Sequence, residues 1–228
     1  MVRVAALRNK SMFLLSRESF DPPFDTQLFE DVAIKALELH NTIASWPESL
    51  PEDWTFSTRP SSESLNGIGH VYSNISHRYS THGHAAIWNR YRAIQLIVNS
   101  IRLRSLSHQL ETLNYPSQRS FVVIQQEACR NNVELLTTDL CAGVLFFFNS
   151  LDPTGLRTLQ LGKSTITTDD EILPKVAGLL AWPLTVAVSC EYIPESQRQW
   201  LKGKLKIVAK SLGDAVLESV VKQGEFRF

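Results

Sequence analysis

The sequence predicts an all-α fold with about six helices in an irregular helical bundle. Three observations lead to this prediction. The 228 residues have an ordinary globular composition, with 43% hydrophobic and 20% charged residues. Apolar residues recur at helical spacing in most of the long segments. No convincing alternating strand is present, because the run from Phe121 to Ile124 is too short to carry a sheet.

The expected organisation is one helical domain with short ends. A chain of this length can bury enough apolar surface to fold without disulfides or a structural metal. We expect a flexible N-terminal segment over residues 1–23, the helical domain over residues 24–223 and a polar tail over residues 224–228.

The first expected helix runs from Phe24 to Trp46 and stops there because Pro47 disfavours helix in the residue before it. Residues 47–69 are rich in Pro, Ser, Glu and Gly, so they predict a surface loop, anchored by Trp54 and Phe56.

Two long helices follow. From Ala85 to Leu106, apolar residues fall at steps of three and four, which predicts one buried helical face. The stretch from Asn114 to Ser117 breaks the pattern, and it resumes from Ser120 to Val144. The sequence therefore predicts two helices joined by a short turn.

Three more helices are expected in the C-terminal part. A strongly apolar helix from about Glu171 to Cys190 contains Pro183, which should kink it. The acids at 169–171 suit its start, where unpaired N–H groups favour negative charge. Residues 194–212 and 215–221 predict the last two helices, separated by Gly213-Asp214.

Charge and cysteine usage exclude several classes of protein. The chain carries 23 Lys and Arg against 23 Asp and Glu, so a generally basic nucleic-acid-binding surface is not expected. Cys129, Cys141 and Cys190 lie far apart in apolar stretches, which favours buried free thiols in a reducing compartment. The longest apolar stretch, from Ala177 to Cys190, is too short to span a bilayer, so we expect no membrane partner.

The strongest candidate for a metal site is a group of four histidines, His70, His77, His82 and His84. Its spacing matches no zinc motif, and no acid or cysteine lies among the four. We expect His70 and His77 to lie on a helix and residues 81–84 to form a turn, which leaves surface and capping roles as the favoured interpretation.

Other motifs are weaker still. Residues 169–171 lack a second acidic turn that would bind Mg²⁺, and Gly67-Ile68-Gly69 lacks the third glycine of a phosphate loop. Arg198, Lys202, Lys206 and Lys210 recur every four residues, which is typical of a solvated helix face. The sequence thus predicts no enzyme, no catalytic residue, no cofactor and no metal.

Three parts of the chain resemble the fungal-specific transcription factor domain, the regulatory domain that follows the zinc binuclear, six-cysteine DNA-binding cluster of fungal regulators. One is LELHNTIASWPESLPEDW from Leu37 to Trp54, and another is the segment from His70 to Leu103, whose core reads WNRYR. The third comprises LLTTDLCAGVLF from Leu135 and then LLAWPLTVAV with QRQWLKGKLKIVAKSLG, up to Gly213.

The resemblance implies an all-α domain that works in transcription regulation in the nucleus, often of a secondary-metabolite gene cluster. Its partners would be proteins, either a second copy of the chain or the transcription machinery. The chain as given has no cysteine before Cys129, so it lacks the DNA-binding cluster and would reach DNA only indirectly or through a missing N-terminal domain.

The matched residues also have roles in the fold. Trp88 and Tyr91 are expected core aromatics, and an unpaired carboxylate at Asp139 would be costly in its apolar stretch. We therefore predict a contact between Arg92 and Asp139. Two alternatives stay open: a small helical enzyme or metal-dependent accessory protein that uses the His70–His84 cluster, and an inert truncated regulator.

Overall fold

The computed structural model describes residues 2–16, 22–60, 75–148 and 172–223. Within these ranges the chain forms seven α-helices and one small antiparallel hairpin of strands. The helices are α1 (Val2–Leu15), α2 (Pro22–Ala44), α3 (His82–Thr112), α4 (Pro116–Phe148), α5 (Pro174–Ser189), α6 (Glu195–Leu212) and α7 (Ala215–Gln223). The all-α prediction is confirmed, and each of the six expected helices is present.

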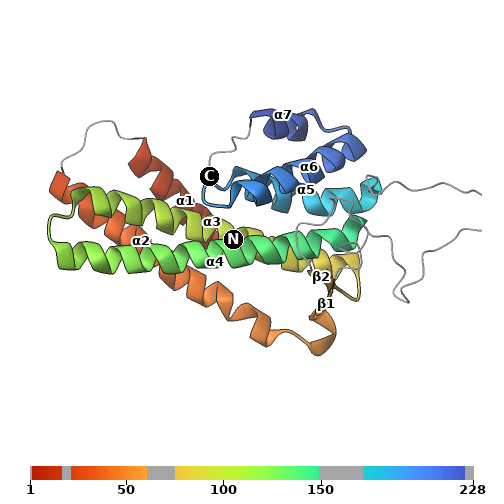
Figure 1. The fold of residues 1–228 in the computed structure, drawn as a ribbon, viewed down its shortest axis with the longest axis horizontal. Coiled ribbons are helices and arrows are strands. Elements are labelled where there is room, and N and C mark those ends of the chain that lie inside the picture. Colours follow the sequence, from red (N-terminus) through yellow and green to blue (C-terminus); the bar gives the residue numbers. More distant parts are fainter. Residues whose placement is uncertain (1, 17–21, 61–74, 149–171, 224–228) are drawn as a thin grey trace, which may run out of the picture.

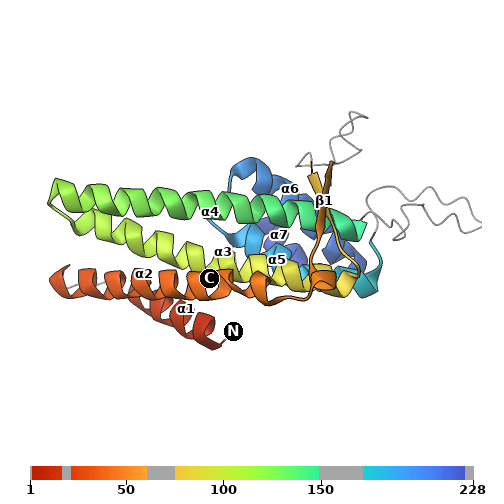
Figure 2. The same ribbon diagram turned by 90° about the horizontal axis from the view of Figure 1, so that it is seen from below.

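Helix α3 lies at the centre of the molecule. Helices α2 and α4 run antiparallel to it on opposite sides, and α5, α6 and α7 form a second group beside α3 and α4 (Figures 1 and 2). The core follows from the apolar spacing of the sequence, since Leu96, Leu140, Leu184 and Leu205 are fully buried on four different helices.

The N-terminal segment was expected to be flexible, but residues 2–15 form the helix α1. Val4, Leu7, Ser11 and Leu14 are buried at steps of three and four, and α1 packs against α2 and α3. The weak amphipathic pattern gives little local signal, so tertiary packing stabilises this helix.

A second difference lies between α2 and α3, where a loop was expected. Two short 3₁₀ helices, η1 (Trp46–Ser49) and η2 (Glu52–Trp54), lead into strand β1 (Ser57–Pro60). Strand β1 pairs antiparallel with β2 (Ile75–Arg78), so that Thr58 lies opposite His77. His77 is therefore in a strand and not on a helix, which corrects the expectation above.

The helix ends have clear local causes. The Thr81 side chain accepts a hydrogen bond from the N–H of His84 and caps α3, so residues 81–84 begin a helix and do not form a free turn. Helix α6 ends at Leu212 and is capped by Gly213, whose φ of 64° is left-handed. The Asp214 side chain then accepts hydrogen bonds from two N–H groups of α7. Helix α5 begins at Pro174, and the expected acidic start at 169–171 lies outside the described residues.

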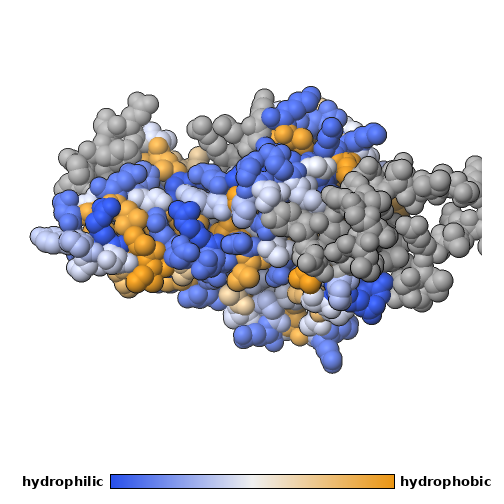
Figure 3. Space-filling model, in the orientation of Figure 1, coloured by the Kyte–Doolittle hydropathy of each residue, from blue (hydrophilic) through white to orange (hydrophobic). Residues whose placement is uncertain are grey.

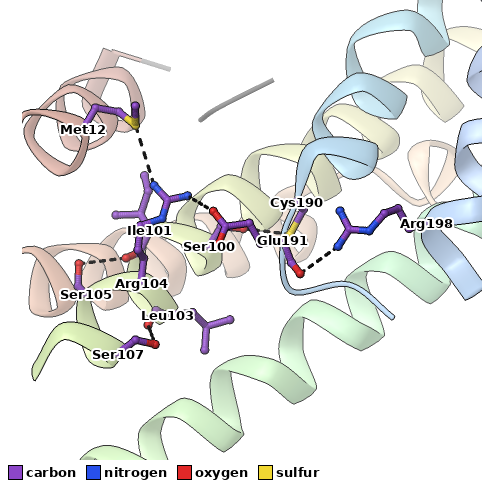
Figure 4. A network of polar contacts seen from close by, with 10 residues as sticks. All are labelled: Met12, Ser100, Ile101, Leu103, Arg104, Ser105, Ser107, Cys190, Glu191 and Arg198. Atoms are coloured by element: carbon purple, nitrogen blue, oxygen red, sulfur yellow. Dashed lines mark hydrogen bonds and ion pairs between the residues drawn. The ribbon is translucent and has the colours of Figure 1, made fainter. Parts of the chain in front are cut away.

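A polar network joins α1, α3 and the α5–α6 corner (Figure 4). Arg104 of α3 donates to the Glu191 carboxylate at 3.1 Å and reaches the Met12 sulfur at 4.0 Å. Arg198 of α6 donates to the carbonyls of Val188 and Glu191, so it satisfies groups at the C-terminal end of α5. Among the described residues, no helix combines the length and apolar character needed to cross a membrane.

Candidate functional site

The candidate site is a buried polar cluster around Arg92 of α3, which we call the Arg92 cluster: His77, Tyr79, Asn89, Arg92 and Gly143. Strand β2 and the residue after it supply His77 and Tyr79, α3 supplies Asn89 and Arg92, and α4 supplies Gly143. Arg92 is 1% exposed, so its charge is removed from water. A buried arginine is costly unless its N–H groups are satisfied, and three surrounding side chains accept hydrogen bonds from Arg92.

Arg92 donates to all three polar side chains of the cluster. Its Nη1 lies 2.7 Å from the Tyr79 hydroxyl and 3.0 Å from Asn89 Oδ1, and its Nη2 lies 3.1 Å from His77 Nδ1. The guanidinium also lies 5.0 Å from the centre of the Phe56 ring and 5.5 Å from that of Trp88. Hydrogen bonds and aromatic faces thus take the place of water around the charge.

His77 is held as a neutral imidazole. Arg92 has no hydrogen-bond acceptor, so its donation to Nδ1 places the ring proton on Nε2. Burial, together with the nearby Arg92 charge, lowers the pKa of His77 to about 3. Tyr79 stays protonated because burial raises the pKa of its hydroxyl. Neither group is placed for proton transfer to a molecule in solvent.

Asp139 does not contact Arg92 directly, which corrects the predicted pair. Asp139 Oδ1 lies 3.7 Å from Nε2 of His77, so the imidazole stands between the carboxylate and the guanidinium. Partial burial raises the pKa of Asp139, and the Arg92 charge opposes this shift. About half of the Asp139 side chain stays exposed, so water solvates the carboxylate. The cost of an unpaired buried carboxylate, from which the contact with Arg92 was predicted, is therefore reduced.

Gly143 makes the close approach of α4 possible. A Cβ at this position would lie 2.6 Å from Asn89 Oδ1 and 2.9 Å from both Arg92 Nη1 and the Tyr79 hydroxyl. These separations are shorter than van der Waals contact, so any side chain would displace the cluster. The only sequence signal for this role is a glycine inside an apolar helical stretch, which does not by itself predict a close approach between helices.

An aromatic wall attaches the α2–β1 connection to the cluster. Trp46 packs against Trp88 and Tyr91 at 5.5 and 5.3 Å between ring centres. The Trp88 indole N–H donates to the carbonyl of Trp54 at 2.8 Å, and Phe56 lies 4.1 Å from the His77 ring. Trp54 and Phe56 therefore anchor this connection, as predicted.

The segments that carry the sequence resemblance meet here. Residues 46–54 come from the first, Trp88, Asn89, Tyr91 and Arg92 from the second, and Gly143 from the third. The remaining part, on α5 and α6, lies elsewhere: Pro183 is inside α5, and Trp182 on the same helix is 36% exposed. The Arg92 cluster thus combines residues of the second and third segments, and the first segment packs beside it against Trp88.

The three described histidines of the candidate metal site do not face one another. His77 belongs to the Arg92 cluster, His84 stacks on Trp54, and His82 lies against Phe146 and Phe147. His70 lies outside the described residues, as do the glycines at 67 and 69. In the part of the chain that the structure describes, no group of three or more His, Cys, Asp or Glu could hold a metal ion.

All three cysteines are buried free thiols, as the sequence predicts. Burial raises the pKa of Cys129 to about 11, and it also raises the pKa of Cys141 and Cys190. A thiol with a raised pKa is a poor nucleophile at neutral pH, because the thiolate is the reactive form.

The four basic residues that recur every four positions on α6, Arg198, Lys202, Lys206 and Lys210, have different surroundings. Arg198 is used by the chain itself at the end of α5. Lys206 and Lys210 are exposed and Lys202 is partly exposed, which agrees with a solvated helix face.

Comparisons with known proteins give no relative. No protein-family model, no curated protein and no solved structure matches this chain.

Proposed function

We propose that the protein is a non-catalytic regulator of transcription that acts in the nucleus through contacts with other proteins. The observation that carries the proposal is that the second and third resembling segments together form the Arg92 cluster. The target implied by the resemblance is a fungal gene cluster, such as one for secondary metabolism.

The chemistry of the cluster supports a positioning role over a catalytic one. Arg92 is buried, His77 is neutral and the thiols carry raised pKa values. Such groups fix the relative positions of β2, α3 and α4 and leave the outer surfaces to make functional contacts. Access to DNA would come through a partner.

A tethering assay tests the proposal. The full chain is fused to a bacterial DNA-binding domain and expressed in a fungal cell with a reporter gene behind the matching operator. We expect a change in reporter transcript relative to the DNA-binding domain alone, and nuclear accumulation of a fluorescent fusion of the chain. An unchanged reporter with a folded, expressed and nuclear fusion would refute the proposal.

A further inference from the structure

The outer face of α4 carries a row of exposed side chains at coiled-coil spacing. Phe121, Ile124, Ala128, Asn131 and Leu135 follow one another at steps of three, four, three and four, and we call them the α4 stripe. Phe121, Ile124 and Leu135 are 65%, 67% and 66% exposed. Figure 3 shows apolar side chains gathered over the N-terminal part of α4.

The α4 stripe is not needed for the core of the chain. Over the same length of α4, the buried residues Val122, Cys129 and Val133 pack inward from the opposite side of the helix. The stripe spans about 21 Å along the axis, at about 1.5 Å per residue. Alternating steps of three and four are the pattern by which one helix packs along another, and a single Asn in such a seam fixes the register of the pair.

The exposed charges along one edge of the α4 stripe are acidic. Glu127 and Glu134 are exposed along one edge, and the structure gives neither an ion pair with a described residue. Asp139 is half exposed one turn beyond Leu135. The nearby bases point elsewhere: Arg119 donates to the carbonyls of Leu110 and Leu113, and Arg130 lies over the Tyr192 ring.

A second copy of α4 fits this face poorly. In an antiparallel pair, heptad geometry places Glu127 of one copy near Glu134 of the other. In a parallel pair it places Glu134 near Asp139. Both arrangements bring like charges together, which opposes self-association.

We propose that the α4 stripe binds an amphipathic helix of a partner protein, with an apolar seam flanked by Lys and Arg. The apolar side chains supply the contact area, and Glu127 and Glu134 select the basic flanks. The proposal deepens the proposed function and rests on it, because it names the surface through which the regulator contacts a protein.

Two designed peptides test the stripe on the purified full chain. Both are about three heptads long with Leu along the seam and one Asn, and they differ only in carrying Lys or Glu at the flanking positions. We expect fluorescence anisotropy to show binding of the Lys peptide, weakened by added salt, and little binding of the Glu peptide. A chain that binds neither peptide, or both equally, overturns the proposal.

Variants locate the binding on α4. Ile124→Ser should weaken binding of the Lys peptide by about tenfold or more. Val216→Ser removes an equally exposed apolar side chain from α7 and should leave the affinity unchanged. The double variant Glu127→Lys/Glu134→Lys should reverse the preference between the two peptides. Unchanged binding by Ile124→Ser, or no reversal by the double variant, refutes the assignment.

Analytical ultracentrifugation of the wild-type chain and of Ile124→Ser tests whether a second copy of the chain, rather than a partner helix, covers the α4 stripe. We expect Ile124→Ser to leave the oligomeric state of the chain unchanged. A wild-type dimer that this variant converts to a monomer would assign the face to a second copy and overturn the proposal. The peptide assay uses no transcription readout, so failure of the stripe and failure of the tethered reporter can be told apart.

Discussion

Replacing Gly143 with alanine tests the Arg92 cluster at its tightest point. The new methyl group would lie 2.6 Å from Asn89 Oδ1 and 2.9 Å from Arg92 Nη1. Overpacking of a core costs about 1–3 kcal/mol, and loss of a charge-assisted hydrogen bond costs about 1.5–3 kcal/mol. Alanine is favoured over glycine inside a helix by about 1 kcal/mol, which offsets part of this cost. We expect a net loss of about 1.5–5 kcal/mol in the free energy of unfolding.

Gly203→Ala is the matched control, because it lies in α6 and a Cβ there meets no atom within 4 Å. This variant should gain up to about 1 kcal/mol from helix propensity alone. Urea unfolding followed by circular dichroism measures both variants. In addition, Asn89→Ala in the Gly143→Ala background should restore part of the loss, since it removes the nearest clashing atom. If Gly143→Ala is as stable as Gly203→Ala, the claim that Gly143 is needed for the close approach of α4 to the Arg92 cluster is refuted.

Three further predictions concern protonation, the end of α5 and the thiols. Burial lowers the pKa of His77 in the folded chain to about 3, against an ordinary value of 6.5. Between pH 6.5 and pH 3, the His77 imidazole is therefore protonated in the unfolded chain and stays neutral in the folded chain. Stability should therefore fall as the pH drops from 6.5 toward 3, and His77→Gln should show a shallower fall in urea midpoint; an identical slope would contradict the assignment. Arg198→Ala removes the hydrogen bonds to the carbonyls of Val188 and Glu191 and should lower the free energy of unfolding by about 1–2 kcal/mol. Lys202→Ala is the control and should change it by less than about 0.5 kcal/mol in the same urea titration. Equal losses in the two variants would argue against a role for Arg198 at the end of α5. The three buried thiols should resist a thiol reagent at about pH 8 in native buffer and react in urea; rapid native labelling would disagree with their burial.

The sequence was sufficient to predict the long helices, because their apolar spacing is a local property. In α3, Ile94, Val98 and Ile101 fall at steps of three and four, and all three pack into the core. The pattern of α1 is shorter and is mixed with basic residues. Its burial depends on α2 and α3, and a local pattern does not contain that information.

The hairpin and the cluster were harder to predict for a related reason. Ile75, His77 and Tyr79 alternate inward, with His77 and Tyr79 buried, which is a strand signal too short to stand out among polar residues. The apolar surroundings of Asp139 correctly suggested a polar partner but did not identify His77. The role of Gly143 depends on the distance between two helices, which spacing along the chain does not define.

The most direct test of the central claim, regulation through protein contacts, is a transcript measurement in the cell that produces the protein. Deleting the gene should change a defined set of transcripts, and the wild-type chain or Val216→Ser should restore them. Ile124→Ser, expressed at the same level, should not restore them, because it removes one of the three large apolar side chains of the α4 stripe. Transcripts that do not respond to the deletion, or full restoration by Ile124→Ser, would contradict the account.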